Sequence, residues 1–230
     1  GDLSPNNVFV SSSHEYAQVW LIDCDNLTYA VRDSSLQIHT PDYGAPELLR
    51  GELGISTYTD IWSFAVMAFR LLTLLHPFKS GFLADSDPEQ EDRALRGELP
   101  WIDHPVDDSN RSEAGVPRDW VFTPALQALF ERCFNVGLQD AAQRPLMAEW
   151  AEAFEAAHAL LVRCEHEDCA SSFFWNKALS CPFCERPTTS VLWLRWVHHL
   201  ICSKEHLPEA NHVQERIIDT GWRQVVGDQA

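Results

Sequence analysis

Two carboxylates and an amide stand at spacings that suit the transfer of a phosphoryl group. Asp2 lies five residues before Asn7, and Asp23 closes the apolar run at residues 19–22. Phosphoryl transfer from ATP needs a carboxylate that orients the incoming hydroxyl and accepts its proton, together with oxygen ligands that hold Mg²⁺ on the phosphates. Asp2, Asn7 and Asp23 could supply these functions if two strands bring the loop ends together.

Four cysteines late in the chain form a second group. The pairs Cys164/Cys169 and Cys181/Cys184 have four and two residues between their members, and eleven residues separate the pairs. Zn²⁺ prefers four soft ligands in a tetrahedron, and a close pair on each of two turns can supply them. We predict a structural site in a zinc ribbon, because four cysteine ligands leave no open coordination position for catalysis.

Alternatives to this zinc site stay open. The four cysteines could be buried thiols or form disulfides, and His166 could replace Cys164 as a ligand. His198, His199 and Cys202 form a tempting second metal set, but they lack a fourth ligand at close spacing. The seven cysteines are odd in number and form one tight cluster, which favours a reducing compartment, taken as the cytoplasm, over a disulfide framework.

The composition limits the classes of partner. The 230 residues carry 17 Lys and Arg against 34 Asp and Glu, a formal net charge of −17. Such a surface repels phosphate backbones and anionic lipids, so we expect neither nucleic acid nor a membrane surface as the main partner. No apolar run reaches the roughly 20 residues that span a bilayer. The chain starts without Met or a signal peptide, and we expect further sequence to precede residue 1.

The elements that would position the acidic groups can be read from the pattern. Residues 7–10 and 18–22 are typical of two short strands around a polar turn. A short helix is expected at residues 45–49, because Pro46 suits a first helical turn. Residues 60–75 are apolar nearly all round, which indicates a helix buried on every side, and residues 76–78 end it.

Further elements follow in two predicted domains. Helices are expected at residues 89–96, 123–134 and 146–161, and a change in composition after Val162 places a boundary there. We therefore predict domains at 1–162 and 163–230. Residues 171–175 could form the first strand of the ribbon, and residues 191–201 and 216–226 are expected to pack around it as strands or a small helix.

Five segments in order resemble the protein kinase family. Asp2 with Asn7 resembles the catalytic loop, and Asp23 resembles the metal-binding aspartate of the Asp-Phe-Gly motif. The remaining three segments resemble the end of the activation segment, the start of the buried helix of the large lobe, and the late arginine that pairs with the activation-segment glutamate. These are residues 40–47, 58–63 and 143–145.

The resemblance implies a fold, an activity and a role for each site residue. The fold would be mainly α, the large carboxy-terminal lobe of a protein kinase followed by a small β-rich zinc ribbon. The activity would be transfer of the ATP γ-phosphate to a Ser or Thr hydroxyl of a protein. Asp2 would be the base, and Asn7 and Asp23 would hold Mg²⁺ and so ATP. Thr40 would align the loop, and three residues would hold the scaffold: Glu47, Asp60 and Arg144. Glu47 and Arg144 are expected to form a buried ion pair.

Departures from the family pattern keep other interpretations open. The resemblance covers about residues 1–162, so the small lobe is absent and the 230 residues alone should not be a competent kinase. Ser4 stands where Ser/Thr kinases have a lysine, and Cys24 and Asp25 replace Phe and Gly. A pseudokinase or adaptor that binds proteins is the alternative, and an aminoglycoside-type phosphotransferase is a third. The Asp-Cys-Asp motif with a cysteine-rich tail resembles bacterial kinases of tellurite-resistance and stress-response clusters.

Overall fold

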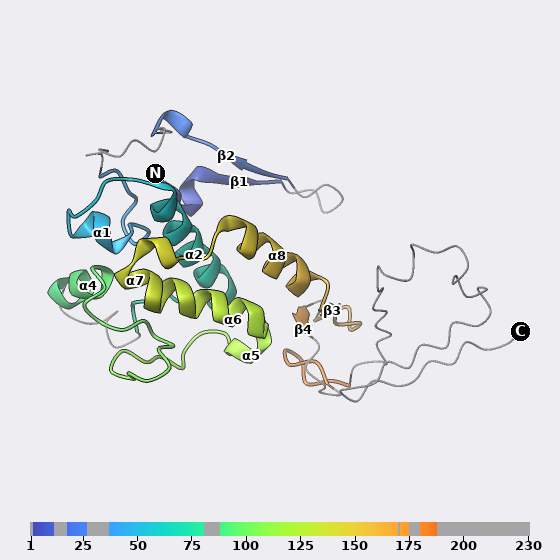
Figure 1. Cartoon of the computed structure of the whole chain (residues 1–230). Helices are drawn as coiled ribbons and strands as arrows, with labels where there is room; N and C mark the ends of the chain where they lie inside the picture. The colour runs from blue at the N-terminus through green and yellow to red at the C-terminus, as the bar shows by residue number, and fades with distance from the viewer. Residues whose placement is uncertain are drawn as a thin grey trace, which may run out of the picture. The chain divides into compact units, whose positions relative to one another are not determined.

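The computed structural model describes residues 2–11, 18–26, 37–80, 88–169, 171–174 and 180–187. The described part is mostly helical with a few short strands (Figure 1). It divides into two compact units, Gly1–Ala159 and Leu160–Ala230. Among the described residues, no helix combines the length and the apolar character that crossing a membrane requires.

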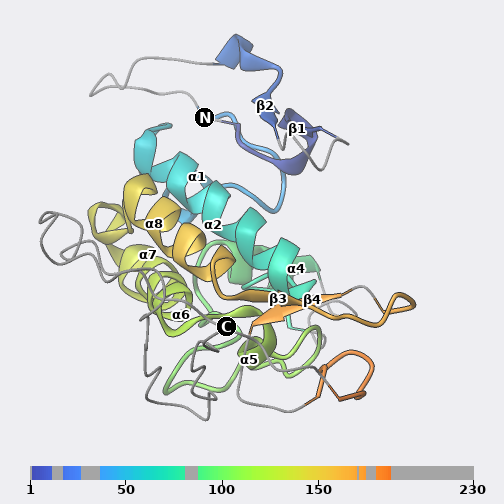
Figure 2. The ribbon, with the colours of Figure 1, turned by 90° about the vertical axis from the view of Figure 1, so that its right-hand side faces the viewer.

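The first unit begins with a hairpin that carries the two predicted strands. The 3-10 helix η1 (Pro5–Asn7) leads into β1 (Val8–Val10), which pairs antiparallel with β2 (Val19–Leu21). The register pairs Val8 with Leu21, so the start of β1 meets the end of β2. In both views the hairpin lies apart from the helices of this unit (Figures 1 and 2).

A short helix and a long helix follow the hairpin. Helix α1 (Pro46–Leu49) begins at the proline, as expected. Helix α2 (Thr57–Thr73) begins three residues earlier than predicted, because Ser56 and Thr59 form a reciprocal capping box. It ends at Leu74, which adopts a left-handed backbone with a φ of 62°. The predicted burial is wrong only near this end, where Leu71 is 71% exposed.

Among the described residues of the first unit, further helices follow, and they are α4 (Pro88–Leu95), α5 (Arg118–Val121), α6 (Pro124–Glu131), α7 (Gly137–Gln139) and α8 (Met147–His158). Thr123 caps α6, with its hydroxyl accepting from the Leu126 N–H at 3.3 Å. A π-helical turn, η3 (Arg132–Val136), continues α6, and a 3-10 turn, η4 (Ala141–Gln143), precedes α8.

Aromatic rings form the core between these helices. Phe134 lies at the centre, with ring centroids 5.4 to 5.9 Å from those of five neighbours, which are Trp62, Phe69, Phe78, Trp101 and Phe130. Helix α8 packs beside α2 through edge contacts of Phe64 with Trp150 and Phe154 (Figures 1 and 2). Because Trp62 and Phe69 belong to α2, this core holds α2 in place, and the loops before α2 pack against it.

The second unit holds a small hairpin and two cysteine turns. Strand β3 (Leu161–Arg163) pairs antiparallel with β4 (Ser172–Phe174), and an isolated bridge joins Ser180 to Pro187. The extension of the last predicted helix to residue 161 is therefore wrong. Leu161 leaves the helix because its backbone pairs with Phe174. Short helix α5 was not predicted, and residues 191–201 and 216–226 lie outside the described residues.

Candidate active site and cysteine cluster

The hairpin brings Asn7 next to the residue that precedes Asp23. The Ile22 N–H donates to the Asn7 carbonyl at 2.9 Å, one step beyond the Val8–Leu21 pair. The Asn7 side-chain amide donates to the Asp2 carbonyl at 2.7 Å, which closes the loop between them. Asp23 has a φ of 55°, a left-handed conformation that Asp tolerates better than most residues. The backbone thus gathers Asp2, Asn7 and Asp23 at one end of the hairpin.

Thr40 reaches this loop from 38 residues away. Its hydroxyl donates to the Asp2 Oδ1 at 2.6 Å. A hydroxyl that bonds one carboxylate oxygen fixes the orientation of the group and leaves the second oxygen with free lone pairs. A carboxylate held in this way can accept a proton from an incoming hydroxyl group.

The ion pair predicted between Glu47 and Arg144 is present. Two guanidinium nitrogens of Arg144 each donate to one Glu47 oxygen at 2.7 Å, and the two side chains are 0% and 6% exposed. Arg144 also donates to the carbonyls of Tyr58 and Gly137, both at 2.9 Å, and its charge lies 4.8 Å from the Trp62 ring centroid. This one residue connects α1, the start of α2 and α7.

Three further predicted positions differ in what surrounds them. Asp60 lies half-buried in the first turn of α2. Ser4 is fully buried, and its hydroxyl has no hydrogen-bond partner among the described residues. Cys24 and Asp25 are exposed in the 3-10 helix η2 (Cys24–Asn26) that follows Asp23.

Sequence reasoning missed a cluster of charged and polar side chains around Asp42, two residues after Thr40. Asp42, His76 and Lys79 form it, with Arg70 and Glu91 at its edge. One signal was available, because Lys79 is the only lysine among residues 1–176. Its neighbours are nevertheless 12 to 37 residues away, so no local pattern points to them.

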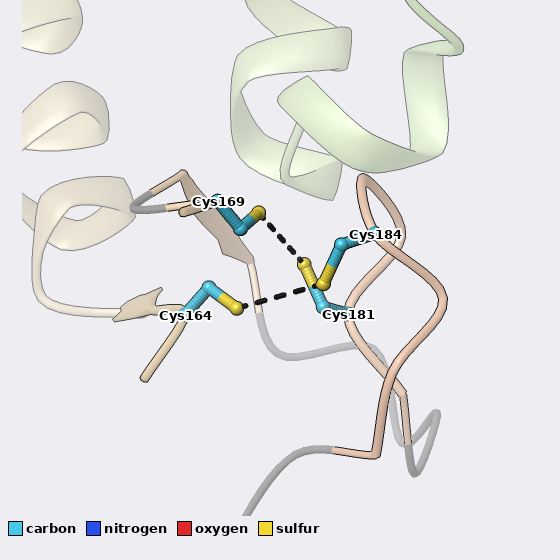
Figure 3. A group of neighbouring side chains, drawn as sticks. All are labelled: Cys164, Cys169, Cys181 and Cys184. Carbon is cyan, nitrogen blue, oxygen red and sulfur yellow. Dashed lines mark hydrogen bonds between the residues drawn. The ribbon is translucent and has the colours of Figure 1, made fainter. Parts of the chain in front are cut away.

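The four predicted zinc ligands converge in the second unit (Figure 3). Their sulfur atoms all lie within 4.8 Å of one another, and the sulfurs of Cys164 and Cys184 are 3.8 Å apart. The sulfurs of Cys169 and Cys181 are 3.9 Å apart, and all four thiols are free. Both close contacts join the first turn to the second.

The distances fit a tetrahedral zinc site. With Zn–S bonds of about 2.3 Å, the edge of a regular tetrahedron of sulfurs measures about 3.8 Å. A disulfide would need an S–S distance of about 2.05 Å. His166 is not part of this cluster, and its Nε2 lies 3.2 Å from the Pro187 carbonyl. The proposed second set, His198, His199 and Cys202, lies outside the described residues.

The environment of Cys184 favours its thiolate form. Desolvation raises the pKa of Cys184, but hydrogen bonds from Arg186 outweigh it and lower the pKa to about 6. Arg186 also pairs with Asp168 of the first turn at 2.6 Å, which ties the two turns together. The charge of Arg186 would offset part of the negative charge that four thiolates around Zn²⁺ leave.

Comparison with known proteins agrees with the geometry of the first unit. Residues 1–155 match the protein kinase domain. A stretch of 164 residues, 69% of this chain, is 27% identical to serine/threonine-protein kinase 17A of Oryctolagus cuniculus and covers 40% of that protein. The chain therefore spans less than half the length of this relative. Because the match to the protein kinase domain extends over more than half of its residues, the chain belongs to the protein kinase family.

Proposed function

We propose that the protein transfers the γ-phosphate of ATP to a Ser or Thr hydroxyl of a protein, with this chain contributing the large lobe. Asp2 acts as the base that accepts the hydroxyl proton. Asn7 and Asp23 hold the Mg²⁺ that binds the phosphates of ATP. Membership of the kinase family and the likeness to a Ser/Thr kinase support the reaction class.

One observation carries this proposal, the hydrogen bond from Thr40 to the Asp2 carboxylate at 2.6 Å. An aspartate that only occupies a turn or the end of a strand does not require a hydrogen bond from a segment 38 residues away. A base needs one, because its lone pair must face the incoming hydroxyl in a fixed direction. Thr40, Glu47, Asp60 and Arg144 serve in this proposal as the scaffold that keeps the loop in place.

The experiment compares Asp23→Ala with Asp25→Ala in the protein that carries a complete kinase domain. Asp25 is two residues away and exposed, so it controls for the loss of a nearby charge. We expect D23A to abolish Mg·ATP-dependent transfer with the fold preserved, and D25A to retain it. Equal transfer by D23A and the parent protein would show that the assigned metal ligand is wrong.

A second candidate, a pseudokinase or adaptor, is favoured by Ser4. A serine that is fully buried and lacks a partner among the described residues cannot supply the positive charge that a lysine brings to the transferred phosphate. Nucleotide binding by the complete protein separates the candidates. If titration with Mg·ATP shows no binding, the adaptor function replaces the enzyme. A small-molecule phosphotransferase is disfavoured by the kinase match.

We also propose that residues 163–230 form a zinc-ribbon tail in which Cys164, Cys169, Cys181 and Cys184 hold one structural Zn²⁺. The support is the tetrahedral spacing of the sulfurs. Elemental analysis should give about one zinc per chain, since four thiolates fill one tetrahedral site. The variant Cys181→Ser should lose this zinc, and Cys24→Ser is its matched control, because Cys24 is exposed and distant in sequence from the four cysteines. A tail that is well folded without metal, or that holds disulfides, would contradict the proposal.

The narrower identification follows from the same residues. The Asp23-Cys24-Asp25 motif and the cysteine-rich tail support a bacterial stress-response kinase of the tellurite-resistance type. The free thiols support a reducing compartment, the cytoplasm. The partners in this proposal are a protein substrate and the small lobe of the same protein, with neither nucleic acid nor membrane.

A further inference from the structure

The turn Thr40–Gly44 is held from several sides within the first unit. At its start, the Thr40 hydroxyl bonds to Asp2, and the Tyr43 N–H donates to the Thr40 carbonyl at 3.1 Å. At its end, the Tyr43 carbonyl accepts from the Ser63 hydroxyl of α2 at 2.8 Å. The conformation of this turn therefore determines where the Thr40 hydroxyl lies relative to Asp2.

Asp42, in the middle of the turn, is the residue whose backbone is least favourable. Its φ is 73°, a left-handed conformation that Asp tolerates better than most residues but that is uncommon outside such turns. Two contacts hold Asp42 in this turn. The Asp42 carbonyl bonds to the His76 Nε2 at 2.9 Å, and its carboxylate bonds to the Lys79 ammonium at 2.5 Å.

Lys79 is the centre of this restraint. Its ammonium bridges Asp42 of the turn and Glu91 of α4, and the Lys79 side chain is 18% exposed. Arg70 of α2 adds a longer contact, 3.7 Å from the other Asp42 oxygen. Desolvation lowers the pKa of Lys79, but its bonds to Asp42 and Glu91 outweigh this and raise it, so the ammonium stays charged.

The histidine fixes the same turn without a charge. Its Nδ1 accepts from the Phe78 N–H at 3.1 Å, so its Nε2 carries the proton that bonds to the Asp42 carbonyl. Residues 76–79 thus contact both the backbone and the side chain of Asp42. The bonds to Lys79 are charge-assisted, which makes them the stronger of the two restraints.

We propose that Lys79 is a positioning residue for the phosphotransfer site: by bridging Asp42 and Glu91 it holds the turn Thr40–Gly44 in its left-handed form and so keeps the Thr40 hydroxyl on the Asp2 carboxylate. The predicted effect of Lys79 on phosphotransfer rests on the proposed function. The predicted effect of Lys79 on the turn Thr40–Gly44 concerns only the conformation of the chain. It can therefore be tested without any measurement of activity.

The test is hydrogen–deuterium exchange of the 230-residue chain, read in the peptide that contains the Tyr43 amide. Lys79→Met removes the charge and keeps the length of the side chain. We expect exchange of this peptide to become about tenfold faster, the factor that matches the loss of a charge-assisted hydrogen bond. Exchange in α6 should stay unchanged. Lys79→Arg, which can still bridge two carboxylates, should restore most of the protection.

Arg93→Gln is the matched control, because it breaks an ion pair with Glu98 that is about half exposed and involves α4. It should leave the Tyr43 peptide unchanged. Asp42→Asn should reproduce the effect of K79M, because it weakens the same bridge from the other side. If K79M speeds exchange in α6 as much as in the turn, Lys79 only stabilises the lobe and the proposal fails. It fails equally if D42N leaves the turn protected.

The activity arm separates this inference from the proposed function. In the protein with a complete kinase domain, K79M should lower kcat about tenfold or more and leave the KM for ATP unchanged, since the turn contacts the base rather than the metal ligands. If the parent protein shows no transfer at all, the proposed function fails while the exchange result still decides the role of Lys79. Transfer by K79M at the parent rate would overturn the positioning role.

Discussion

Removal of the Arg144 guanidinium should destabilise the first unit more than removal of any exposed arginine. Arg144→Ala leaves the Glu47 carboxylate buried without its counter-ion, since the pair is 0% and 6% exposed. Stranding one member of a buried pair costs about 3–5 kcal/mol. The carbonyls of Tyr58 and Gly137 lose a donor as well, at about 1 kcal/mol each where water cannot replace it. We therefore expect a loss of about 5 kcal/mol.

Urea unfolding followed by tryptophan fluorescence suits this measurement. The ring centroid of Trp62 lies 4.8 Å from the Arg144 guanidinium, so Trp62 is one of the nine tryptophans that contribute to the signal. With a slope of about 2 kcal/mol per molar urea, the midpoint should fall by about 2 M or more. Arg111→Ala is the control, because that residue is exposed, and its effect should stay within about 0.5 kcal/mol.

The double variant Glu47→Leu with Arg144→Met tests the cause. It removes both charges and keeps most of the volume, so it should be more stable than R144A, although neither ion pair nor hydrogen bonds remain. A stability of R144A within about 1 kcal/mol of R111A would refute the reasoning. So would a double variant that is less stable than R144A, because the cost would then arise from lost attraction rather than from a stranded charge.

Three further outcomes are expected. Burial lowers the pKa of His76 to about 4, although a hydrogen bond to the Asp42 carbonyl and the charge of the Asp42 carboxylate oppose this shift. Because His76 takes up a proton below about pH 6.5 in the unfolded chain, up to about 3 kcal/mol of stability should be lost as the pH falls from about 6.5 to 4. The unfolding of His76→Gln should depend less on pH in that window. Thr123→Ala removes the α6 cap and should cost about 1 kcal/mol in thermal unfolding of the first unit. Cys181→Ser should lower zinc binding in a chelator competition and unfold the second unit, with the circular dichroism of the first unit unchanged. A protein that keeps its zinc after this change would remove Cys181 from the proposed ligands.

Local physics was enough to predict most elements. The Thr123-Pro124 pair, Pro46 and the apolar residues 8–10 before a polar turn each act over a few neighbouring residues, so the sequence by itself predicts where these elements lie. The cysteine pairs likewise indicate a common ligand set by their short spacings. The kinase resemblance, rather than any local pattern, linked Glu47 to Arg144 across 97 positions.

The tertiary structure decided those features of the protein that depend on long-range contacts. Leu161 continues the apolar period of α8, yet it forms a strand because Phe174 offers its backbone as a partner. The left-handed turn at Asp42 is contacted by His76 and Lys79, which lie 34 and 37 residues further along the chain. The sulfur of Cys164 lies close to that of Cys184, and the sulfur of Cys169 close to that of Cys181, because of the way the two turns face each other. Spacing along a chain limits which residues can meet, but the packing of separate segments selects which of them do.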